Sequence, residues 1–180
     1  MTQPLTIRRA TEQDVPVLLD FIRELAQYER LTHLLAITER QLAQELFGAN
    51  SRVEALLAHC DGEPAAFAVY FHNFSTFLGR KGLYLEDLYV RPEYRRRGYG
   101  RAMLVELARI AHERGCGRFE WTVLDWNKPA IDFYRSLGAD LLQDWRICRV
   151  TGAALEQLAQ SAMPGPHVAR PAQPADPDEE

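Results

Sequence analysis

The pattern of apolar and polar positions along the chain predicts a mixed α/β fold. Residues 5–9 alternate between apolar and polar side chains, which is the period-two pattern of a strand. Apolar runs bounded by turn residues predict further strands at 53–60, 64–71, 83–90, 119–124 and 141–150. Apolar positions three and four apart predict helices at 11–28, 38–47, 98–114, 129–137 and 153–159.

Turn and cap residues support these boundaries. Thr11 and Thr38 have the chemistry of helix N-caps, and Asp14 completes a variant capping box after Thr11. Asp61-Gly62 is a tight-turn signal that joins two strands into a hairpin. A later strand–helix–strand unit predicts one parallel pair, whereas the hairpins predict antiparallel pairing. We therefore expect an α/β fold with a mixed, mostly antiparallel central sheet and helices on both faces.

Composition predicts one globular domain followed by a tail. The chain has 180 residues, of which 47% are apolar and 26% charged, and we assign residues 1–160 to a single domain. Residues 161–180 are rich in proline and end in acidic residues, which is typical of a disordered tail. With one Arg against four acidic residues, the tail carries −3 of the net charge of −4, which leaves −1 on the domain. A nearly neutral domain argues against a nucleic-acid partner.

Membrane-spanning, secreted and metal-binding proteins are disfavoured as well. No run approaches the roughly 20 apolar residues that span a bilayer, and the first residues lack the layout of a signal peptide. We therefore expect a cytoplasmic protein with no membrane partner. The three cysteines and five histidines show no metal-ligand spacing, so we expect no metal.

The most informative segment is the run Arg95-Arg96-Arg97-Gly98-Tyr99-Gly100, which has the form Arg/Gln-x-x-Gly-x-Gly/Ala and opens the helix predicted at 98–114. Glycine lets backbone N–H groups approach a phosphate closely, and the start of a helix adds unpaired N–H groups and a positive dipole end. The arginines, with Arg101, add charge suited to a pyrophosphate. The run predicts an anion cradle, and a solvated basic surface is the alternative.

The chain resembles the GNAT superfamily of N-acetyltransferases, and within it the diamine (spermidine/spermine) acetyltransferase group. The resemblance covers residues 6–150 and is carried by the blocks IRRAT, ELAQYE, LYLEDLYV, YRRRGYG and DWNKPAIDFYRSLGA. It implies the GNAT fold, in which the fourth and fifth strands splay apart to admit the cofactor. It also implies acetyl-CoA as co-substrate and a small-molecule amine as acceptor. Related enzymes are often dimers, so a homodimer is a further expectation.

The resemblance implies a set of site residues. The positions that match cofactor-binding residues are Leu88, Tyr89, Val90, Arg95, Arg96, Arg97, Gly98, Tyr99, Gly100, Arg101, Asn127, Lys128, Pro129, Ala130 and Tyr134. The positions that match acceptor-binding residues are Tyr28, Glu29 and Glu86. Tyr134 matches the general acid, and Glu86 is the acidic residue expected near the amine.

These residue types fit acetyl transfer. An alkyl amine has a pKa of about 10.4 and arrives protonated, so a base such as Glu86 must remove its proton, through a water or with a raised pKa. A free backbone N–H near 88–90 can stabilise the oxyanion, and the Tyr134 hydroxyl can protonate the departing thiolate. Structural alternatives remain open: a core aromatic for Tyr134, an ion pair for Glu86, and a solvated pair for Tyr28 and Glu29. Asp87 should point to the face opposite Glu86.

The sequence also departs from the diamine group. Arg96 stands where those enzymes usually carry glycine, and Lys128 where the eukaryotic enzymes carry an acid. Arg80, Lys81 and Lys128 are three cations expected near the mouth of the cleft, where they would repel a polycation and attract a carboxylate. The sequence therefore favours an acceptor with both an amine and a carboxylate, such as a lysine-like amino acid. The competing functions are acetylation of a protein Lys or N-terminus, a non-catalytic acyl-CoA-binding domain, and an Arg-patch nucleic-acid module.

Overall fold

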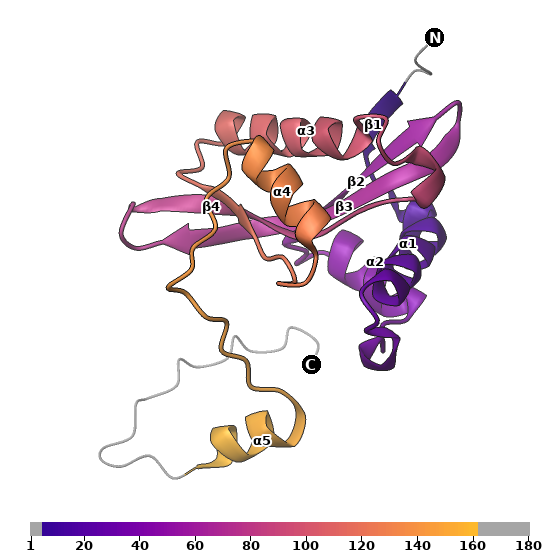
Figure 1. The fold of residues 1–180 in the computed structure, drawn as a ribbon. Helices are drawn as coiled ribbons and strands as arrows, with labels where there is room; N and C mark the ends of the chain where they lie inside the picture. Colours follow the sequence, from indigo (N-terminus) through magenta and orange to yellow (C-terminus); the bar gives the residue numbers. More distant parts are fainter. Residues whose placement is uncertain (1–4, 162–180) are drawn as a thin grey trace. The chain divides into compact units, whose positions relative to one another are not determined.

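The computed structural model describes residues 5–161, and their strands form one five-stranded sheet (Figure 1). The strands lie in the order β1 (Leu5–Arg9), β2 (Val53–Cys60), β3 (Glu63–Ser75), β4 (Arg80–Val90) and β5 (Phe119–Trp121). Neighbours pair antiparallel except for β4 and β5, which are parallel. The predicted mixed sheet with one parallel pair is confirmed. The tail predicted at 161–180 lies, from residue 162 onward, outside the described residues.

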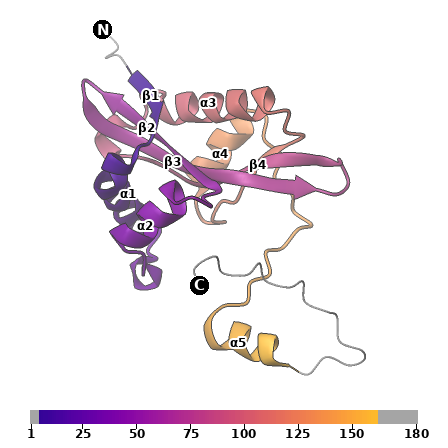
Figure 2. The ribbon, with the colours of Figure 1, turned by 180° about the vertical axis from the view of Figure 1, so that it is seen from behind.

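Helices lie on both faces of the sheet, as predicted. On one face lie α1 (Val15–Tyr28) and α2 (Glu39–Phe47), and on the other lies α3 (Tyr99–Glu113) (Figures 1 and 2). Short 3-10 helices occupy Glu12–Asp14, Thr32–Leu34 and Pro92–Tyr94. Among the helices of residues 5–161, none is long and apolar enough to cross a bilayer.

The chain divides into two compact units, residues 1–128 and residues 129–180, and each is described by itself. The sheet and α1 to α3 belong to the first unit. The second contains nearly all of α4 (Lys128–Ser136) and all of α5 (Gly152–Gln160).

Two core clusters fix the direction of the side chains at the end of β4. In the larger cluster, the Phe21 ring of α1 lies 5.2 Å from the Phe67 ring and 6.4 Å from the Tyr89 ring. The smaller cluster joins Tyr99 of α3 to Cys60, and Val90 packs against it. Tyr89 therefore faces α1, and its neighbour Val90 faces α3.

The predicted caps and the first hairpin are confirmed. The backbone N–H and hydroxyl of Thr11 donate to Asp14 at 2.7 and 2.8 Å, and Thr38 forms a capping box with Gln41. Asp61 and Gly62 join β2 to β3 with positive φ angles of 52° and 86°. Both residue types tolerate this left-handed conformation, which explains why they form the turn.

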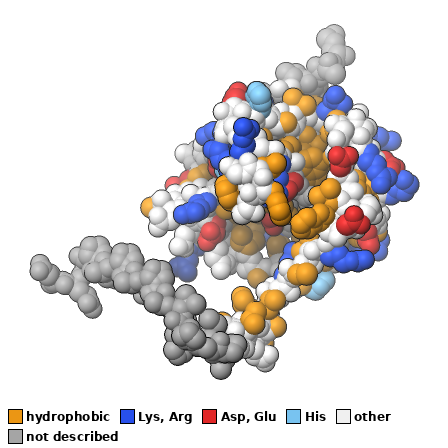
Figure 3. Space-filling model, turned by 90° about the vertical axis from the view of Figure 1, so that its left-hand side faces the viewer, with side chains coloured by type: hydrophobic (Ala, Val, Ile, Leu, Met, Phe, Trp, Pro, Cys, Tyr) orange, Lys and Arg blue, Asp and Glu red, His pale blue; other side chains and the backbone are white. Residues whose placement is uncertain are grey.

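The β3–β4 hairpin is longer than the sequence predicted. Its ladder continues from Phe71 and Tyr84 out to Ser75 and Arg80, so the stretch expected as a connection is mostly strand. Phe77, near the tip of the hairpin, is 96% exposed. Figure 3 views the molecule from the side to which the hairpin projects in Figure 1, and exposed hydrophobic and basic side chains are visible on this face. The added strand residues, 72–75 and 80–82, are mostly polar, so they lack the apolar run from which the other strands were predicted. An exposed hairpin does not need an apolar face.

Two strand predictions need correction. β5 ends at Trp121 and not at 124. Residues 141–150, predicted as the last strand, form no strand, and Leu142, Trp145 and Ile147 are exposed. An apolar run shows that a segment suits a strand, but a strand also needs a neighbouring backbone to pair with, and the run does not identify one.

Candidate active site

The site begins at an interruption of the sheet. β4 pairs with β3 over its whole length, but it pairs with β5 only through Leu83, Tyr84 and Leu85. Beyond Leu85, no strand among the described residues pairs with this edge of β4. The expected splay of the fourth and fifth strands is therefore present. Its free edge covers Leu88, Tyr89 and Val90, the backbone stretch predicted to bind the pantetheine arm.

A β-bulge lies next to this free edge. Val69 pairs with Asp87 but Tyr70 pairs with Leu85, so Glu86 is an extra residue on β4. A bulge interrupts the alternation of a strand and redirects the side chains that follow it. Residues two apart on a strand face the same way, so Asp87 shares the α1 side with Tyr89. The sequence predicted that only one of the two acids would face the acceptor, and the bulge directs Asp87 toward the end of α1.

Three carboxylates gather around this point. Glu86 is exposed, whereas Asp87 and Glu29 are partly buried. Burial raises the pKa of Asp87 to about 7, and the negative charges of Glu86 and Glu29 add to the effect. Burial also raises the pKa of Glu29. Glu29 follows Tyr28, whose ring centroid lies 6.4 Å from that of Tyr89, so the end of α1 lies beside the part of β4 that carries Asp87.

Tyr28 connects α1 to the segment before α4. Its hydroxyl donates to Asn127 Oδ1 at 3.3 Å, and its ring centroid lies 6.1 Å from Trp126 and 6.4 Å from Tyr89. Asn127 is buried, and Tyr28 keeps 38% of its surface exposed. Tyr28, a predicted acceptor residue, therefore contacts Asn127, a predicted cofactor residue. The rings of Tyr28, Trp126 and Tyr89 form an aromatic wall. From the sequence, Trp126 fitted either the core or a cleft wall, and its position beside Asn127 was a usable signal for the wall.

The predicted phosphate loop precedes α3. Gly98 is the N-cap of the helix with a φ of 84°, and Arg96 also has a positive φ of 60°. Such conformations are typical of loops that present several N–H groups to an anion. Arg96, Arg97 and Arg101 are exposed, and Gly100 is partly exposed. This arrangement fits the pyrophosphate of a coenzyme.

Two loop side chains do not point outward. The Tyr99 hydroxyl donates to Cys60 Sγ at 3.0 Å inside the core, so only its backbone is available to a ligand. Arg95 turns back: its Nε donates to the Val90 carbonyl at 2.9 Å, and its guanidinium carbon lies 4.8 Å from the Tyr28 ring centroid. The sequence grouped Arg95 with the phosphate contacts, but its side chain lies against the aromatic wall.

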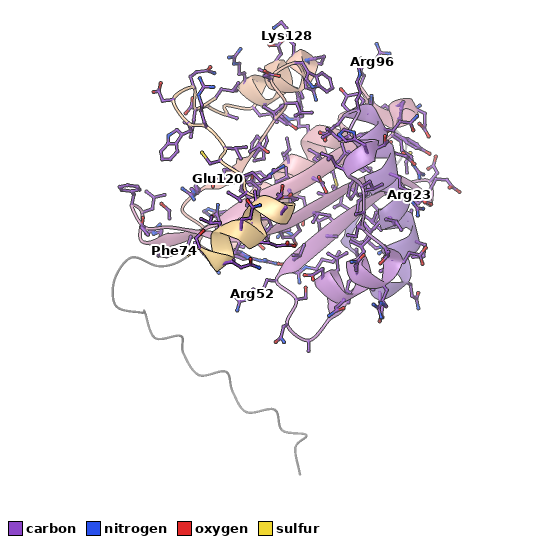
Figure 4. All side chains as sticks on the ribbon, turned by 90° about the horizontal axis from the view of Figure 1, so that it is seen from below. Arg23, Arg52, Phe74, Arg96, Glu120 and Lys128 are labelled. Carbon is purple, nitrogen blue, oxygen red and sulfur yellow. The ribbon has the colours of Figure 1, made fainter. Side chains whose placement is uncertain are left out.

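The cations that suggested a carboxylate-bearing acceptor are not together. Arg80 and Lys81 pair with Ser75 and Phe74 at the hairpin end of β4. Lys81 precedes Asp87 by six residues, which is about 20 Å along a strand. Figure 4 shows Arg96 and Phe74 at opposite ends of the sheet. The expectation that Arg80 and Lys81 line the cleft is therefore wrong, because the long hairpin carries them away. Lys128 follows Asn127 in the chain and is exposed, and its place at the cleft stays a prediction.

The remaining predicted residues lie in the second unit. Pro129, Ala130 and Tyr134 are on α4, where Ala130 and Tyr134 are partly buried. The Tyr134 ring lies 5.5 Å from the Phe133 ring, and its carbonyl accepts the Leu137 N–H at 3.0 Å. The roles given to these three residues stay predictions.

Comparison with known proteins identifies the class. The profile of the acetyltransferase (GNAT) family matches residues 18–139, which is more than half of the chain. The chain belongs to this family and is an N-acetyltransferase.

The relatives narrow the class. A thialysine N-epsilon-acetyltransferase from Sus scrofa is 40% identical over 164 residues, covering 85% of this chain and 96% of that protein. The L-ornithine N5-acetyltransferase NATA1 from Arabidopsis thaliana is 35% identical over 199 residues, covering 84% and 86%. Among solved structures, an integron cassette protein from the mobile metagenome of V. cholerae matches with a TM-score of 0.73 and 30% identity, covering 89% and 99%. These similarities support acetyl transfer to the amine of a small molecule.

Proposed function

We propose that this protein transfers the acetyl group of acetyl-CoA to the distal amine of a basic amino acid of the lysine or ornithine type. The observation that carries the proposal is the position of the Asp87 and Glu29 carboxylates beside the free edge of β4. A free strand edge can pair with an extended amide-containing chain, and a carboxylate can hold an ammonium group. Acyl donor and amine would then meet at the bulge.

Acetyl-CoA fits the first unit in two places. The two amides of its pantetheine arm would pair with the β4 backbone at 88–90, in the manner of an added strand. Its pyrophosphate would accept N–H groups from the loop around Gly98 and from the start of α3, with Arg96, Arg97 and Arg101 adding charge. Asn127, Lys128, Pro129 and Ala130 are proposed as further contacts on the strength of the resemblance.

Asp87 is the base that this geometry favours. The pKa of Asp87 is raised from 3.8 to about 7, so it differs from the amine pKa of about 10.4 by about 3 units less than an ordinary Asp does. Proton transfer between the amine and Asp87 is therefore more favourable by about 4 kcal/mol. At pH 8 most of Asp87 is ionised and ready to accept a proton. Glu86, the base predicted from the sequence, is exposed on the bulge, where its charge raises the pKa of Asp87. Glu29 would hold the ammonium group before transfer.

The reaction follows from these positions. Asp87 takes a proton from the ammonium group, and the amine nitrogen then forms a bond with the thioester carbonyl carbon. A backbone N–H at the free edge of β4 stabilises the resulting oxyanion. Collapse of this intermediate breaks the carbon–sulfur bond. The nitrogen releases its second proton to solvent to give the amide, and the CoA thiolate takes a proton from a general acid. We assign that acid to Tyr134 on the resemblance.

The names of the relatives support this acceptor class. Thialysine and ornithine each carry a distal amine and an α-carboxylate, so acceptors of this kind occur among relatives at 35–40% identity.

A thiol-release assay tests the proposal. Purified protein and acetyl-CoA are incubated with lysine, thialysine, ornithine or spermidine, and with norleucine as a matched control that lacks the distal amine. We expect thiol release with the amino acids that carry a distal amine, with kcat/KM at least tenfold above that for spermidine, and none with norleucine. Mass spectrometry should place the acetyl group on the distal nitrogen. A tenfold preference for spermidine would contradict the acceptor class, and no release with any amine would contradict the function.

A further inference from the structure

Tyr99 occupies a position that the loop motif leaves open. In the pattern Arg/Gln-x-x-Gly-x-Gly/Ala it is the residue between the two glycines, where any side chain satisfies the motif. It is also the first residue of α3, so its backbone N–H is one of those that find no acceptor within the helix. Its side chain, however, is buried, and its hydroxyl donates to Cys60 Sγ at 3.0 Å. The side chain therefore fixes, from the core, a backbone group that the proposed function offers to a ligand.

The bond between Tyr99 and Cys60 joins two separate parts of the chain. Cys60 is the last residue of β2, so the bond ties the start of α3 to the end of a strand 39 residues away. The two side chains lie in a small apolar cluster with Ala65, against which Leu5, Val90 and Tyr94 pack. A phenol hydroxyl inside such a cluster has lost water as a partner, so it depends on the one acceptor that it finds there. The start of α3 is thereby attached to the sheet at one defined point.

The same support extends into the loop itself. The Tyr94 ring stacks on the Tyr99 ring with 6.2 Å between centroids, and the Arg97 guanidinium carbon lies 5.6 Å from the Tyr94 centroid. Between these rings the chain passes through two positive φ angles, 60° at Arg96 and 84° at Gly98. A positive φ at an arginine costs free energy and persists only where the surrounding structure maintains it. The buried bond and the aromatic stack provide that maintenance on the core side of the loop.

We propose that Cys60 and Tyr99 are positioning residues for the pyrophosphate of the acyl donor, because their hydrogen bond holds the loop and the start of α3 in the binding conformation before the donor arrives. This inference rests on the proposed function, since it concerns the loop that would bind the coenzyme. A loop that is already ordered loses less conformational entropy on binding, so the pair strengthens the affinity for the donor. The pair takes no part in acetyl transfer, and its effect falls on the Kd and KM of the donor and not on kcat.

Tyr99→Phe tests this role, because it removes the hydroxyl and keeps the ring. The Kd of acetyl-CoA, measured by calorimetry, should rise about 3- to 10-fold, the effect expected of one buried hydrogen bond, while kcat with lysine at saturating acetyl-CoA stays nearly unchanged. Cys60→Ala should have the same effect. Cys60→Ser, whose hydroxyl can accept the bond, should restore most of the affinity. The double variant Cys60→Ala, Tyr99→Phe should bind no more weakly than either single variant, because both changes remove the same bond.

Acetyl-CoA and S-acetylpantetheine form a matched pair of donors, because the second lacks the pyrophosphate and the nucleotide. Tyr99→Phe should lower kcat/KM for acetyl-CoA by the same factor of about 3 to 10 and leave the value for S-acetylpantetheine nearly unchanged. Tyr70→Phe is the control for a structural effect. Tyr70 is also buried and its hydroxyl donates to Glu54 Oε2 at 3.2 Å, but this bond joins β3 to the opposite end of β2 from Cys60. The control should lower the melting temperature and leave the Kd of acetyl-CoA unchanged.

Three results would overturn the proposal: an unchanged Kd for acetyl-CoA in Tyr99→Phe, equal losses with the two donors, or an equal rise in Kd in Tyr70→Phe. The last would mean that affinity follows the stability of the fold and not the loop. If the wild-type protein binds acetyl-CoA but releases thiol with no amine, the proposed function fails, and the calorimetric comparison still decides the role of the pair. If the wild-type protein does not bind acetyl-CoA, both the proposed function and the role of the pair are refuted.

Discussion

The two ends of β4 share one strand and one partner strand but differ in character. At the hairpin end, Arg80 and Lys81 pair regularly with β3 and their side chains are exposed. At the other end, β4 lies beyond the last residue of β5, contains a bulge at Glu86 and carries the partly buried Asp87. Chemistry is possible where the regular ladder is broken, because unpaired backbone groups and a redirected side chain become available together. The charge count of a segment does not reveal this difference.

Removing the carboxylate at the bulge should have the largest effect. Asp87→Asn keeps the shape of the side chain but cannot accept a proton, so kcat for lysine should fall about 10²- to 10⁴-fold. Glu86→Gln is the matched control on the exposed side of the bulge, and its loss should be at least tenfold smaller. Steady-state kinetics at pH 8 with saturating acetyl-CoA measure both. The opposite order of effects would return the base to Glu86.

Straining the loop before α3 should abolish cofactor binding. Gly98 has a φ of 84°, which a β-branched residue adopts only at a cost, so Gly98→Val should remove the rise in melting temperature that acetyl-CoA causes. Gly115, with a φ of 68° at the other end of α3, provides the control. Gly115→Val should lower stability in a similar way but keep the shift with acetyl-CoA. Loss of the shift in both variants would mean that it reports the stability of α3 and not the loop.

The Asp87 carboxylate should lower the stability of the folded protein at neutral and alkaline pH. A pKa of about 7 means that the folded protein holds the Asp87 proton more tightly than the unfolded chain does. Ionisation therefore reduces stability as the pH rises from about 4 to about 7, and the whole cost is present above pH 7. Asp87→Asn should raise the free energy of unfolding at pH 8 by on the order of 2–4 kcal/mol and have little effect at pH 4. Urea unfolding at the two pH values measures this, and an equal effect at both would contradict the raised pKa.

Changing the hairpin cations should have the smallest effect. Lys81 is about 20 Å from Asp87 along the strand, well beyond the screening length of about 8 Å at physiological ionic strength. The double variant Arg80→Gln, Lys81→Gln should therefore change the kcat/KM ratio of lysine to spermidine less than twofold. A tenfold shift toward spermidine would show that these cations act on the acceptor despite their place in the fold.

Local rules predicted much of the fold from the sequence. Thr11, Thr38 and Asp61-Gly62 mark their caps and turn because each local conformation depends on the residue at that position. The helix after the glycine loop was found for the same reason. Residues 141–150 were misassigned because strand pairing depends on a partner that lies elsewhere in the chain.

The site was less predictable, because it depends on one extra residue in a strand. The alternation of a strand placed Asp87 on the face opposite Glu86 but gave no reason to choose Asp87 as the base. The bulge that decides this is visible only in the pairing of β3 with β4, which the sequence does not show. The direction of Arg95 was hidden in the same way, because its contacts with Val90, Tyr28 and Tyr89 connect three separate segments. The motif identified the loop, but it did not show that the Arg95 side chain points away from the phosphate position and packs against Tyr28 and Tyr89.

The pH dependence of kcat/KM for lysine tests the central claim most directly. With Asp87 as the base, the wild-type profile should rise with pH through an apparent pKa of about 7, since the protonated carboxyl cannot accept a proton. In Asp87→Asn this step should disappear, while Glu86→Gln should keep it and move it to lower pH by removing a negative neighbour. A profile with the same step near pH 7 in wild type and Asp87→Asn would contradict the assignment of Asp87 as the base.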